Sequence, residues 1–571
     1  MLKKHFPLII ALLILTAAVN SSYPQTRTVG LFLNDTSLSY NGYTLMAPNK
    51  YTATYLINNQ GRLVHKWSNS AYSPGNAVYL LPNGNLLRSC KVQGYIVGGE
   101  GGRVELYSWG DTLLWYYNHN TQNYITHHDV RYLPNGNVLM IACEKKTLAQ
   151  ALASGFDSSK FQSEIITSGY MLPDYIIEVQ PTYPSGGTIV WEWHVWDHLI
   201  QDFDPTKLNY GVVANHPELV DCDGDGVQKA KLLWNHMNSI NYNAKLDQII
   251  ISCRSNSEIW VIDHSTTTLQ AAGHTGGRYG QGGDLLYRWG NPACYKLGTS
   301  ANQKLFMQHD AEWVDSLCPG AGNMTVFNNG VGRNYSSADQ FVPPVDSLGF
   351  YYRAAGTAFG PTSLAWTYTA TPPASFYCAN ISGVQRLPNG NTLITGGPTG
   401  NLFEVTSGGQ VVWKYINPVI NTGPLYFDDS IPIDPNNTGT FQNYVFKVHR
   451  YAPTYEAFTG KDLTPGNFIE LYHTGIIRES GSTPSSFRLY QNYPNPFNPS
   501  TTIRYEIPER CQVSIIVYDI LGKQIKTLTG ETHSPGTYRV NFDASGYPGG
   551  VYFCRITAGK FAETKKMILI K

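Results

Sequence analysis

A repeated turn phrase constrains the fold of this chain more than any other feature. Leu-Pro-Asn-Gly-Asn occurs at 81–85, 133–137 and 387–391, each time before an apolar segment. Asn-Gly between two strand-like segments is the signal of a tight β-hairpin. A second phrase, an apolar segment that closes on aromatic residues, occurs six times between 61–67 and 410–415. Small sheets repeated in this way must stack to cover their apolar faces, so the repeats predict a six-bladed β-propeller.

Composition agrees with an all-β chain. The 571 residues include 54 Gly, 39 Tyr and 12 Trp, and only 14% are charged, which is typical of many short strands joined by turns. The chain carries 41 Lys and Arg against 41 Asp and Glu. Because no net field attracts a polyanion, we expect no nucleic acid partner.

The N-terminal segment predicts export. Lys3 and Lys4 precede an apolar stretch at 6–19, and small and polar residues follow it. This layout predicts a signal peptide at 1–25. No later run reaches about 18 apolar residues, so no transmembrane segment is expected once the signal is removed. The nine cysteines show no metal-ligand spacing, and most are expected to be small buried residues.

The pattern of the chain changes near its end. Residues 478–486 are polar and contain Ser and Pro, which predicts a linker. From 487 to 571, alternating strands separated by Gly and Pro turns predict a small immunoglobulin-like β-sandwich. The predicted propeller therefore occupies 26–477.

The repeats also locate a candidate site. The segments before the hairpins align as one strand that occurs six times, and these six copies begin near Asn76, His128, His236, His309, Ser382 and Lys447. If this strand is the innermost of each blade, its first residues meet at one mouth of the central channel. Histidines from distant parts of the sequence would then share one pocket. The alternative is that single histidines only bind neighbouring backbone.

Two other stretches contain groups that can bind metals. Asp221, Asp223 and Asp225 match the opening of a calcium-binding loop, although Leu232 replaces the Glu that would close it. Two interpretations of this stretch stay open: it binds a structural calcium ion, or it is a solvated acidic turn. The stretch WEWHVWDHL, which contains His194 and His198, could form a metal or aromatic site. Alternating aromatics more often cover a sheet face, so we interpret it as structural.

The C-terminal residues resemble the type IX secretion C-terminal sorting domain. The resemblance rests on YQNYPNPFNPSTTIRYEIP at 490–508, VYDILGKQIKTL at 517–528 and the closing KKMILIK. It implies that the type IX secretion machinery is a partner and that the protein is secreted or held at the cell surface.

The region before the tail is similar to the aryl-sulfate sulfotransferase family. The similarity rests on LLWNHMNSINYN, QHDAEWV, TVFNNGVGR and ISGVQRLPNGNTL. It implies a six-bladed propeller that transfers a sulfuryl group from a phenolic sulfate donor to a phenol acceptor, with no cofactor and no nucleotide donor. In the family, one histidine is transiently sulfurylated while other histidines and an arginine assist. The matching residues here are His236, His309 and Arg333.

One family feature is missing from this sequence. The family's nucleophilic histidine lies in the fifth-blade region, but this chain has no histidine between His309 and His449. His128, His449 or His309 could take that role. Two other functions stay open: a non-catalytic surface propeller that binds a glycan or a protein, and a different hydrolase or lyase on the same scaffold.

Overall fold

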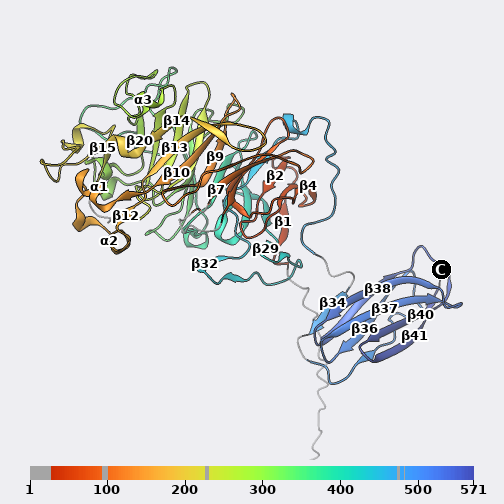
Figure 1. The fold of residues 1–571 in the computed structure, drawn as a ribbon. Helices are drawn as coiled ribbons and strands as arrows, with labels where there is room; N and C mark the ends of the chain where they lie inside the picture. The colour runs from red at the N-terminus through yellow and green to blue at the C-terminus, as the bar shows by residue number, and fades with distance from the viewer. Residues whose placement is uncertain are drawn as a thin grey trace, which may run out of the picture. The chain divides into compact units, whose positions relative to one another are not determined.

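The computed structural model describes residues 27–92, 99, 101–224, 230–471, 476–480 and 483–570. The predicted signal peptide at 1–25 lies outside these ranges. The chain forms two compact units, one comprising Arg27–Leu471 and the other including Tyr472–Lys571 (Figure 1). Each unit is built almost entirely from strands, which confirms the predicted all-β class.

The larger unit contains six antiparallel sheets of at least four strands, which we number as blades in chain order. The first blade comprises β5 (Pro74–Leu80), β6 (Leu86–Lys91), β7 (Gly102–Tyr107) and β8 (Leu113–Asn118). The second comprises β9 (Tyr124–Tyr132), β10 (Val138–Glu144), β13 (Asp174–Pro181) and β14 (Gly187–His194). The third comprises β17 (Met237–Asn243), β18 (Gln248–Cys253), β19 (Glu258–Asp263) and β20 (Tyr287–Trp289).

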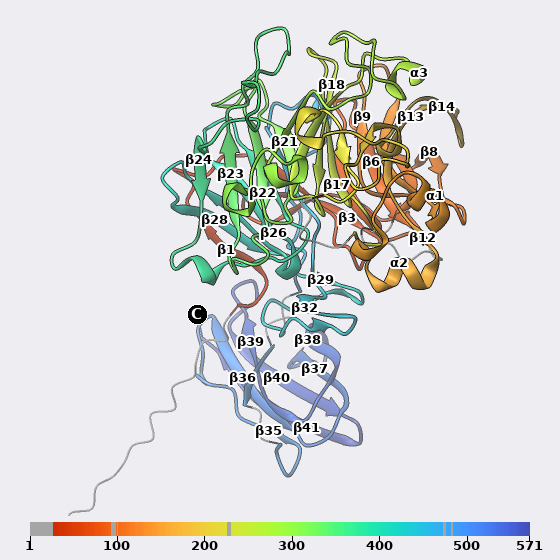
Figure 2. The ribbon, with the colours of Figure 1, turned by 90° about the vertical axis from the view of Figure 1, so that its left-hand side faces the viewer.

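The remaining blades close the ring. The fourth comprises β21 (His309–Trp313), β22 (Met324–Asn328), β23 (Ser337–Phe341) and β24 (Trp366–Tyr368), side by side in Figure 2. The fifth comprises β25 (Gly383–Arg386), β26 (Thr392–Gly396), β27 (Asn401–Val405) and β28 (Val411–Ile416), with β1 (Gly30–Asn34) outside β28. The sixth comprises β33 (His449–Tyr451), β2 (Tyr43–Met46), β3 (Thr54–Asn58) and β4 (Leu63–Trp67).

The first strands of the blades face one another in ring order. β5 contacts β9, β9 contacts β17, β17 contacts β21, and β21 contacts β25. The step from β25 to β33 is made by Gln385, whose amide donates to Arg450 O at 3.1 Å and accepts from Arg450 N at 2.7 Å. Because β33 completes a sheet begun by β2, the two ends of this unit hold the ring closed. The predicted six blades are confirmed.

Both repeated phrases have the predicted structural roles. In the three Asn-Gly turns, Gly84, Gly136 and Gly390 have φ angles of 85°, 89° and 86°, a region that favours glycine. The turns join β5 to β6, β9 to β10 and β25 to β26. The aromatic phrase forms the fourth strand from the inner edge of each blade, from β4 to β28. Its Trp side chains lie between neighbouring blades, and Trp115 and Trp413 are fully buried.

Short elements interrupt the blades. Between β10 and β13 they are β11 (Lys146–Thr147), α1 (Leu148–Ala153), η1 (Ser158–Lys160), α2 (Ser163–Ser168) and β12 (Tyr170–Met171). Between β14 and β17 they are η2 (Val195–His198), β15 (Leu199–Ile200), η3 (Val213–Asn215) and β16 (Val220–Asp221). The others are α3 (Thr268–Ala271), η4 (Pro292–Tyr295), η5 (Ser300–Asn302), η6 (Pro373–Ser375), η7 (Gly397–Thr399), β29 (Val419–Ile420), β30 (Gly423–Pro424), β31 (Ile433–Asp434), β32 (Asn437–Phe441) and η8 (Glu456–Phe458). None of the helices in the described ranges is long and apolar enough to cross a bilayer.

The smaller unit is a two-sheet β domain. One sheet has β34 (Ile476–Ser480), β39 (Gly536–Asp543), β36 (Ser500–Ile507) and β35 (Arg488–Leu489) in spatial order. The other has β38 (Gln524–His533), β37 (Cys511–Asp519), β40 (Gly550–Ala558) and β41 (Phe561–Leu569). One apolar core joins them. The first residues of the predicted linker at 478–486 belong to a strand, because β34 extends to Ser480 and pairs with β39.

Candidate active site

The inner strands β9, β17 and β21 have a distorted backbone near their histidines. His128 and His236 have φ angles of 56° and 53°, in the left-handed region that side chains rarely adopt. The pairing of β9 with β10 shifts register at this point, and β17 and β21 show the same irregularity. Such bulges redirect side chains, and non-glycine residues in this conformation concentrate at functional sites.

Three of the predicted histidines converge at these bulges. The imidazole rings of His128 and His236 lie with centroids 5.0 Å apart. The ring of Phe446 lies 6.0 Å from His128 and 6.2 Å from His309. His128 and His309 are buried, and His236 is half-buried. Residues from three blades thus form one cluster.

The surroundings keep these imidazoles neutral. Burial and, after it, the nearby positive charge of Arg254 lower the pKa of His309 to about 3. Burial and neighbouring positive groups also hold the pKa of His128 and of His236 well below the usual value. A histidine whose pKa lies below its ordinary value of about 6.5 is unprotonated at pH 7. Each ring therefore offers a lone pair.

One hydrogen bond fixes the tautomer of His309. Its Nδ1 lies 2.7 Å from Asn329 Oδ1. The Asn329 amide nitrogen donates to the Cys378 and Ile381 carbonyls, so its oxygen must face the histidine. An amide oxygen only accepts, so Nδ1 carries the hydrogen and Nε2 carries the lone pair.

His128 is the end of a short relay. Asp174 Oδ1 lies 3.2 Å from His127 Nε2, and His127 Nδ1 lies 2.8 Å from His128 Nδ1. The carboxylate accepts from His127, so His127 in turn accepts from His128. The other oxygen of Asp174 accepts from the Met237 backbone amide at 2.5 Å, beside His236. The arrangement can accept a proton at His128 and spread its charge toward a carboxylate.

An arginine that we did not predict borders the cluster. Arg254 N donates to His236 O at 3.2 Å, and the side chain of Arg254 reaches Ala379 O at 3.5 Å. Its charge lowers the pKa of His236 and of His309, as described above. Arg254 is thus a cation beside three neutral bases.

The predicted anion-binding residue, Arg333, has other contacts. Its Nε donates to Tyr335 O at 3.1 Å, and its Nη2 donates to Ser337 Oγ at 2.6 Å. Its guanidinium also lies over the rings of Phe306 and Tyr335. These contacts hold Arg333 in its own loop, although it stays half-exposed.

The fifth predicted residue, His449, lies in a separate network. His449 Nε2 lies 3.5 Å from Glu312 Oε1. Glu312 is also 3.5 Å from Lys447 Nζ, which contacts Asp129 Oδ2 at 3.0 Å and Asp310 Oδ1 at 2.7 Å. Burial alone would lower the pKa of Lys447, but these carboxylates raise it well above its ordinary value. The network joins the residues that follow His128 and His309 and stabilises the inner strands.

The fifth blade presents a serine at the register of the other histidines. Ser382 is fully buried, with a φ angle of 88°. Its hydroxyl accepts from Gly397 N at 3.0 Å, and its own amide donates to Phe446 O at 3.0 Å. Both contacts tie Ser382 to neighbouring backbone.

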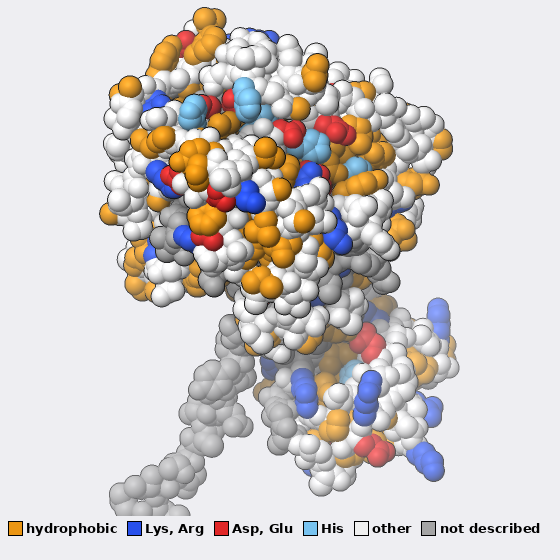
Figure 3. All heavy atoms as spheres, turned by 60° about the vertical axis from the view of Figure 1, so that its left-hand side comes forward, with side chains coloured by type: hydrophobic (Ala, Val, Ile, Leu, Met, Phe, Trp, Pro, Cys, Tyr) orange, Lys and Arg blue, Asp and Glu red, His pale blue; other side chains and the backbone are white. Residues whose placement is uncertain are grey.

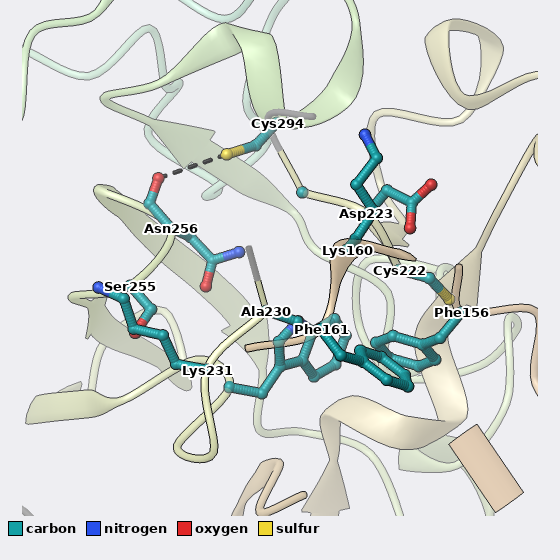
Figure 4. Close-up of a pocket in the computed structure, with 12 residues that line it drawn as sticks. Phe156, Lys160, Phe161, Cys222, Asp223, Ala230, Lys231, Ser255, Asn256 and Cys294 are labelled. Carbon is teal, nitrogen blue, oxygen red and sulfur yellow. Dashed lines mark hydrogen bonds between the residues drawn. The ribbon is translucent and has the colours of Figure 1, made fainter. Parts of the chain in front are cut away.

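A solvent-open pocket lies next to the backbone of this cluster (Figure 4). It is lined by Lys231, Ser255 and Asn256, among others. Ser255 N donates to Asn235 O at 3.0 Å, the residue before His236. The lining includes none of the three histidines.

The predicted calcium residues flank that pocket. Burial raises the pKa of Asp221 to about 7, and Lys296 Nζ lies 3.6 Å from its Oδ2. Asp223 lines the pocket, where burial also raises its pKa. Asp225 lies outside the described residues. The ammonium group of Lys296 already faces the Asp221 carboxylate, where calcium would bind. Calcium binding stays a prediction.

Gly99 supports the ring of His128, which gives a testable prediction. Gly99 O accepts from His128 N at 2.8 Å, and a Cβ on Gly99 would come within 1.9 Å of His128 Cε1. The substitution Gly99→Ala must displace the ring, so we expect turnover to fall about 10²-fold. Gly169→Ala is the matched control, because Gly169 has a similar φ of 75° and open space around it. Equal losses in the two variants would contradict this role.

Comparison with known proteins decides the family. The model of the arylsulfotransferase (ASST) family matches residues 33–422. The chain belongs to the arylsulfotransferase family. The arylsulfate sulfotransferase AssT of Escherichia coli O6:H1 (strain CFT073) is 27% identical over 261 residues, covering 41% of this chain and 40% of that protein. The matched part of this chain thus spans about two fifths of the curated relative.

Solved structures with a similar arrangement are more distant. A protein of unknown function from Bacteroides caccae is 13% identical, with a TM-score of 0.37, and the match covers 72% of this chain and 99% of that chain. A virginiamycin B lyase from Staphylococcus aureus is 9% identical, with a TM-score of 0.31 and coverage of 69% and 85%. The model of the secretion system C-terminal sorting domain matches residues 491–571. This match confirms the predicted type IX sorting domain.

Four residues of the cluster were absent from our sequence-based set: His127, Asp174, Arg254 and Asn329. Two had visible signals. His127 precedes His128 in HHDV, and Arg254 lies in SCRSNS, directly after the strand that pairs with β17. Asp174 and Asn329 have none, because only the fold brings them to the histidines.

Proposed function

We propose that this arylsulfotransferase moves a sulfuryl group from a phenolic sulfate to a phenol through His309, with no nucleotide donor. The hydrogen bond from His309 Nδ1 to Asn329 carries this assignment. A neutral imidazole with its lone pair held on Nε2 is a ready nucleophile at pH 7. His449 is a weaker candidate, because Glu312 and the Lys447 network surround it.

The first half-reaction transfers sulfur to nitrogen. The lone pair on Nε2 of His309 attacks the sulfur, and the bond between sulfur and the aryl oxygen breaks. The sulfuryl group stays on Nε2, while Nδ1 keeps its hydrogen and its bond to Asn329. The leaving phenolate departs with the bonding electrons. The fixed tautomer supports this step because no proton has to leave the ring first.

The second half-reaction needs a base, and the relay supports His128 in that role. Nε2 of His128 takes the proton of the acceptor phenol, and the phenol oxygen attacks sulfur as the bond to His309 breaks. The charge that appears on His128 is spread toward Asp174 through His127. The same proton passes to the next leaving phenolate, so protons balance over one cycle.

We assign Arg254 as the cation that binds the sulfuryl oxygens. Substitution of Arg254 tests the proposal. Removing a donor to developing negative charge costs about 10²–10³-fold in turnover. We therefore expect that loss for Arg254→Gln in transfer from 4-nitrophenyl sulfate to phenol. Arg333→Gln, which removes the predicted clamp, is expected to change the rate less than about tenfold.

The reverse ranking, with Arg333→Gln inactive and Arg254→Gln near wild type, would contradict the assignment. Full transfer by both variants would contradict a role for either arginine. Far-UV circular dichroism on both variants checks that the sheets are intact.

The sorting domain supports export as part of the same proposal. We infer that the enzyme acts outside the cytoplasm, at the cell surface or after release, on phenolic sulfates and phenols. The predicted signal peptide would start this route, and the type IX machinery would complete it. A histidine-based mechanism suits that location, because it needs no nucleotide cosubstrate.

A further inference from the structure

We propose that His198, His274 and Asp284 bind a divalent transition metal ion of the Zn²⁺ type. The site lies outside the cluster of His128, His236 and His309. His198 ends η2, which leaves the second blade after β14, whereas His274 and Asp284 lie between β19 and β20 of the third blade. A metal at this point would join two neighbouring blades.

The donor atoms already converge. One nitrogen from each histidine and one carboxylate oxygen all lie within 4.8 Å of one another. His198 Nδ1 and His274 Nδ1 are each 2.8 Å from Asp284 Oδ1. Two imidazole nitrogens and one carboxylate oxygen are a donor set that zinc binds in three-ligand sites with an open fourth position.

The second nitrogen of His198 shows which atom faces the site. His198 Nε2 lies 2.8 Å from the carbonyl oxygen of Ala271. A carbonyl only accepts, so Nε2 carries the hydrogen and Nδ1 of the neutral ring carries a lone pair. That lone pair points at a carboxylate oxygen, another acceptor. Two acceptors at this distance must share either a proton or a metal ion, and a ring that donates its other N–H to a carbonyl has the usual orientation of a metal-binding histidine.

The surroundings hold His198 rigidly in place. Its ring stacks on Trp193, with centroids 5.5 Å apart and planes 8° apart. Trp193 Nε1 donates to Gly283 O at 2.7 Å. A Cβ on Gly283 would come within 1.9 Å of Ala271 O, so only glycine lets the carbonyl reach His198. Each of these contacts comes from a different segment, and together they fix the first ligand before a metal arrives.

Two of the three ligand side chains are buried and one is exposed to solvent. The side chains of His198 and Asp284 are 0% and 8% exposed, whereas that of His274 is 59% exposed. A metal ion can therefore reach the site from solvent on the His274 side, and water can fill the fourth position. Figure 3 shows histidine side chains next to acidic ones on the surface of the larger unit. Two nitrogen ligands disfavour Ca²⁺ and Mg²⁺, which prefer oxygen.

Zinc and cobalt binding to the full chain tests the site. The wild type is expected to bind one Zn²⁺ more than Asp284→Asn, measured by competition with a metal-indicator dye after chelator treatment. Co²⁺ bound there should give the intense visible bands of a tetrahedral centre. Zn²⁺ should also raise the temperature of the tryptophan-fluorescence unfolding transition in the wild type.

Two variants make the result decisive. His274→Ala removes an exposed ligand without disturbing the core, and we expect it to weaken Zn²⁺ binding roughly tenfold or more. His216→Ala is the matched control, because His216 is also exposed and pairs with one carboxylate, that of Glu218, at 2.9 Å. Equal Zn²⁺ affinity in wild type, His274→Ala and Asp284→Asn would overturn the proposal, as would Co²⁺ spectra that are the same in all three.

Discussion

Replacing His309 by alanine is expected to reduce sulfuryl transfer from 4-nitrophenyl sulfate to phenol by about 10³-fold or more. The substitution removes the nitrogen that accepts the sulfuryl group, and the loss of a nucleophile has the largest effect of any single change at such a site. Release of nitrophenol with and without phenol measures the effect.

His449→Gln is the comparison for that variant. His449 was one of the candidates for the missing nucleophile, but it lies beside Glu312, in a different network. Its substitution is expected to leave most of the transfer activity. A folded His449→Gln protein that is as inactive as His309→Ala would contradict the choice of His309.

Replacing Lys447 by methionine is expected to destabilise the larger unit by about 3–5 kcal/mol. Removing one partner of a buried ion pair leaves the other charges unpaired in a medium of low polarity. Lys447 is 1% exposed at its side chain and contacts Asp129 and Asp310, which belong to two different blades. Urea unfolding followed by tryptophan fluorescence measures this loss selectively, because all 12 tryptophans lie in the larger unit.

Lys50→Met is the matched control for that measurement. Lys50 Nζ pairs with Asp434 at 3.0 Å, but its side chain is 27% exposed. Partly solvated pairs contribute about 1 kcal/mol or less. If Lys447→Met is as stable as Lys50→Met, the prediction is wrong, because the fold then does not need Lys447 to balance the buried carboxylates.

The repeats made the fold predictable from sequence. Asn-Gly turns and aromatic strands recur because each blade must cover the same apolar faces. The inner strands can therefore be aligned from the sequence alone. That alignment grouped His128, His236 and His309, and the structure brings these three residues close to one another. The family resemblance placed the missing histidine in the fifth-blade region, because the chain has no histidine between His309 and His449.

The partners of those histidines could not be predicted in the same way. Arg254 and Asn329 lie on turns between strands, where no periodic pattern states the direction of a side chain. The choice of Arg333 as the clamp came from the family resemblance, but Tyr335 and Ser337 occupy its guanidinium. Asp174 starts a strand of the second blade and contacts His127 only because β9 is bulged.

The cluster of His198, His274 and Asp284 shows the same limit. His198 could be seen as a possible ligand within WEWHVWDHL, but its partners follow more than 70 residues later. Without them, the alternating aromatics around His198 favoured a structural interpretation. Contacts between neighbouring blades depend on how the blades are arranged in the ring. No local sequence pattern predicts that arrangement.

Trapping the sulfurylated enzyme tests the central claim most directly. The full-length wild type would be mixed with 4-nitrophenyl sulfate in the absence of phenol, quenched at alkaline pH and digested for mass spectrometry. We predict one added SO₃ group, on the peptide that contains His309, and its disappearance when phenol is added before the quench. An SO₃ group on a peptide that lacks His309, or turnover with no labelled peptide at all, would contradict the account.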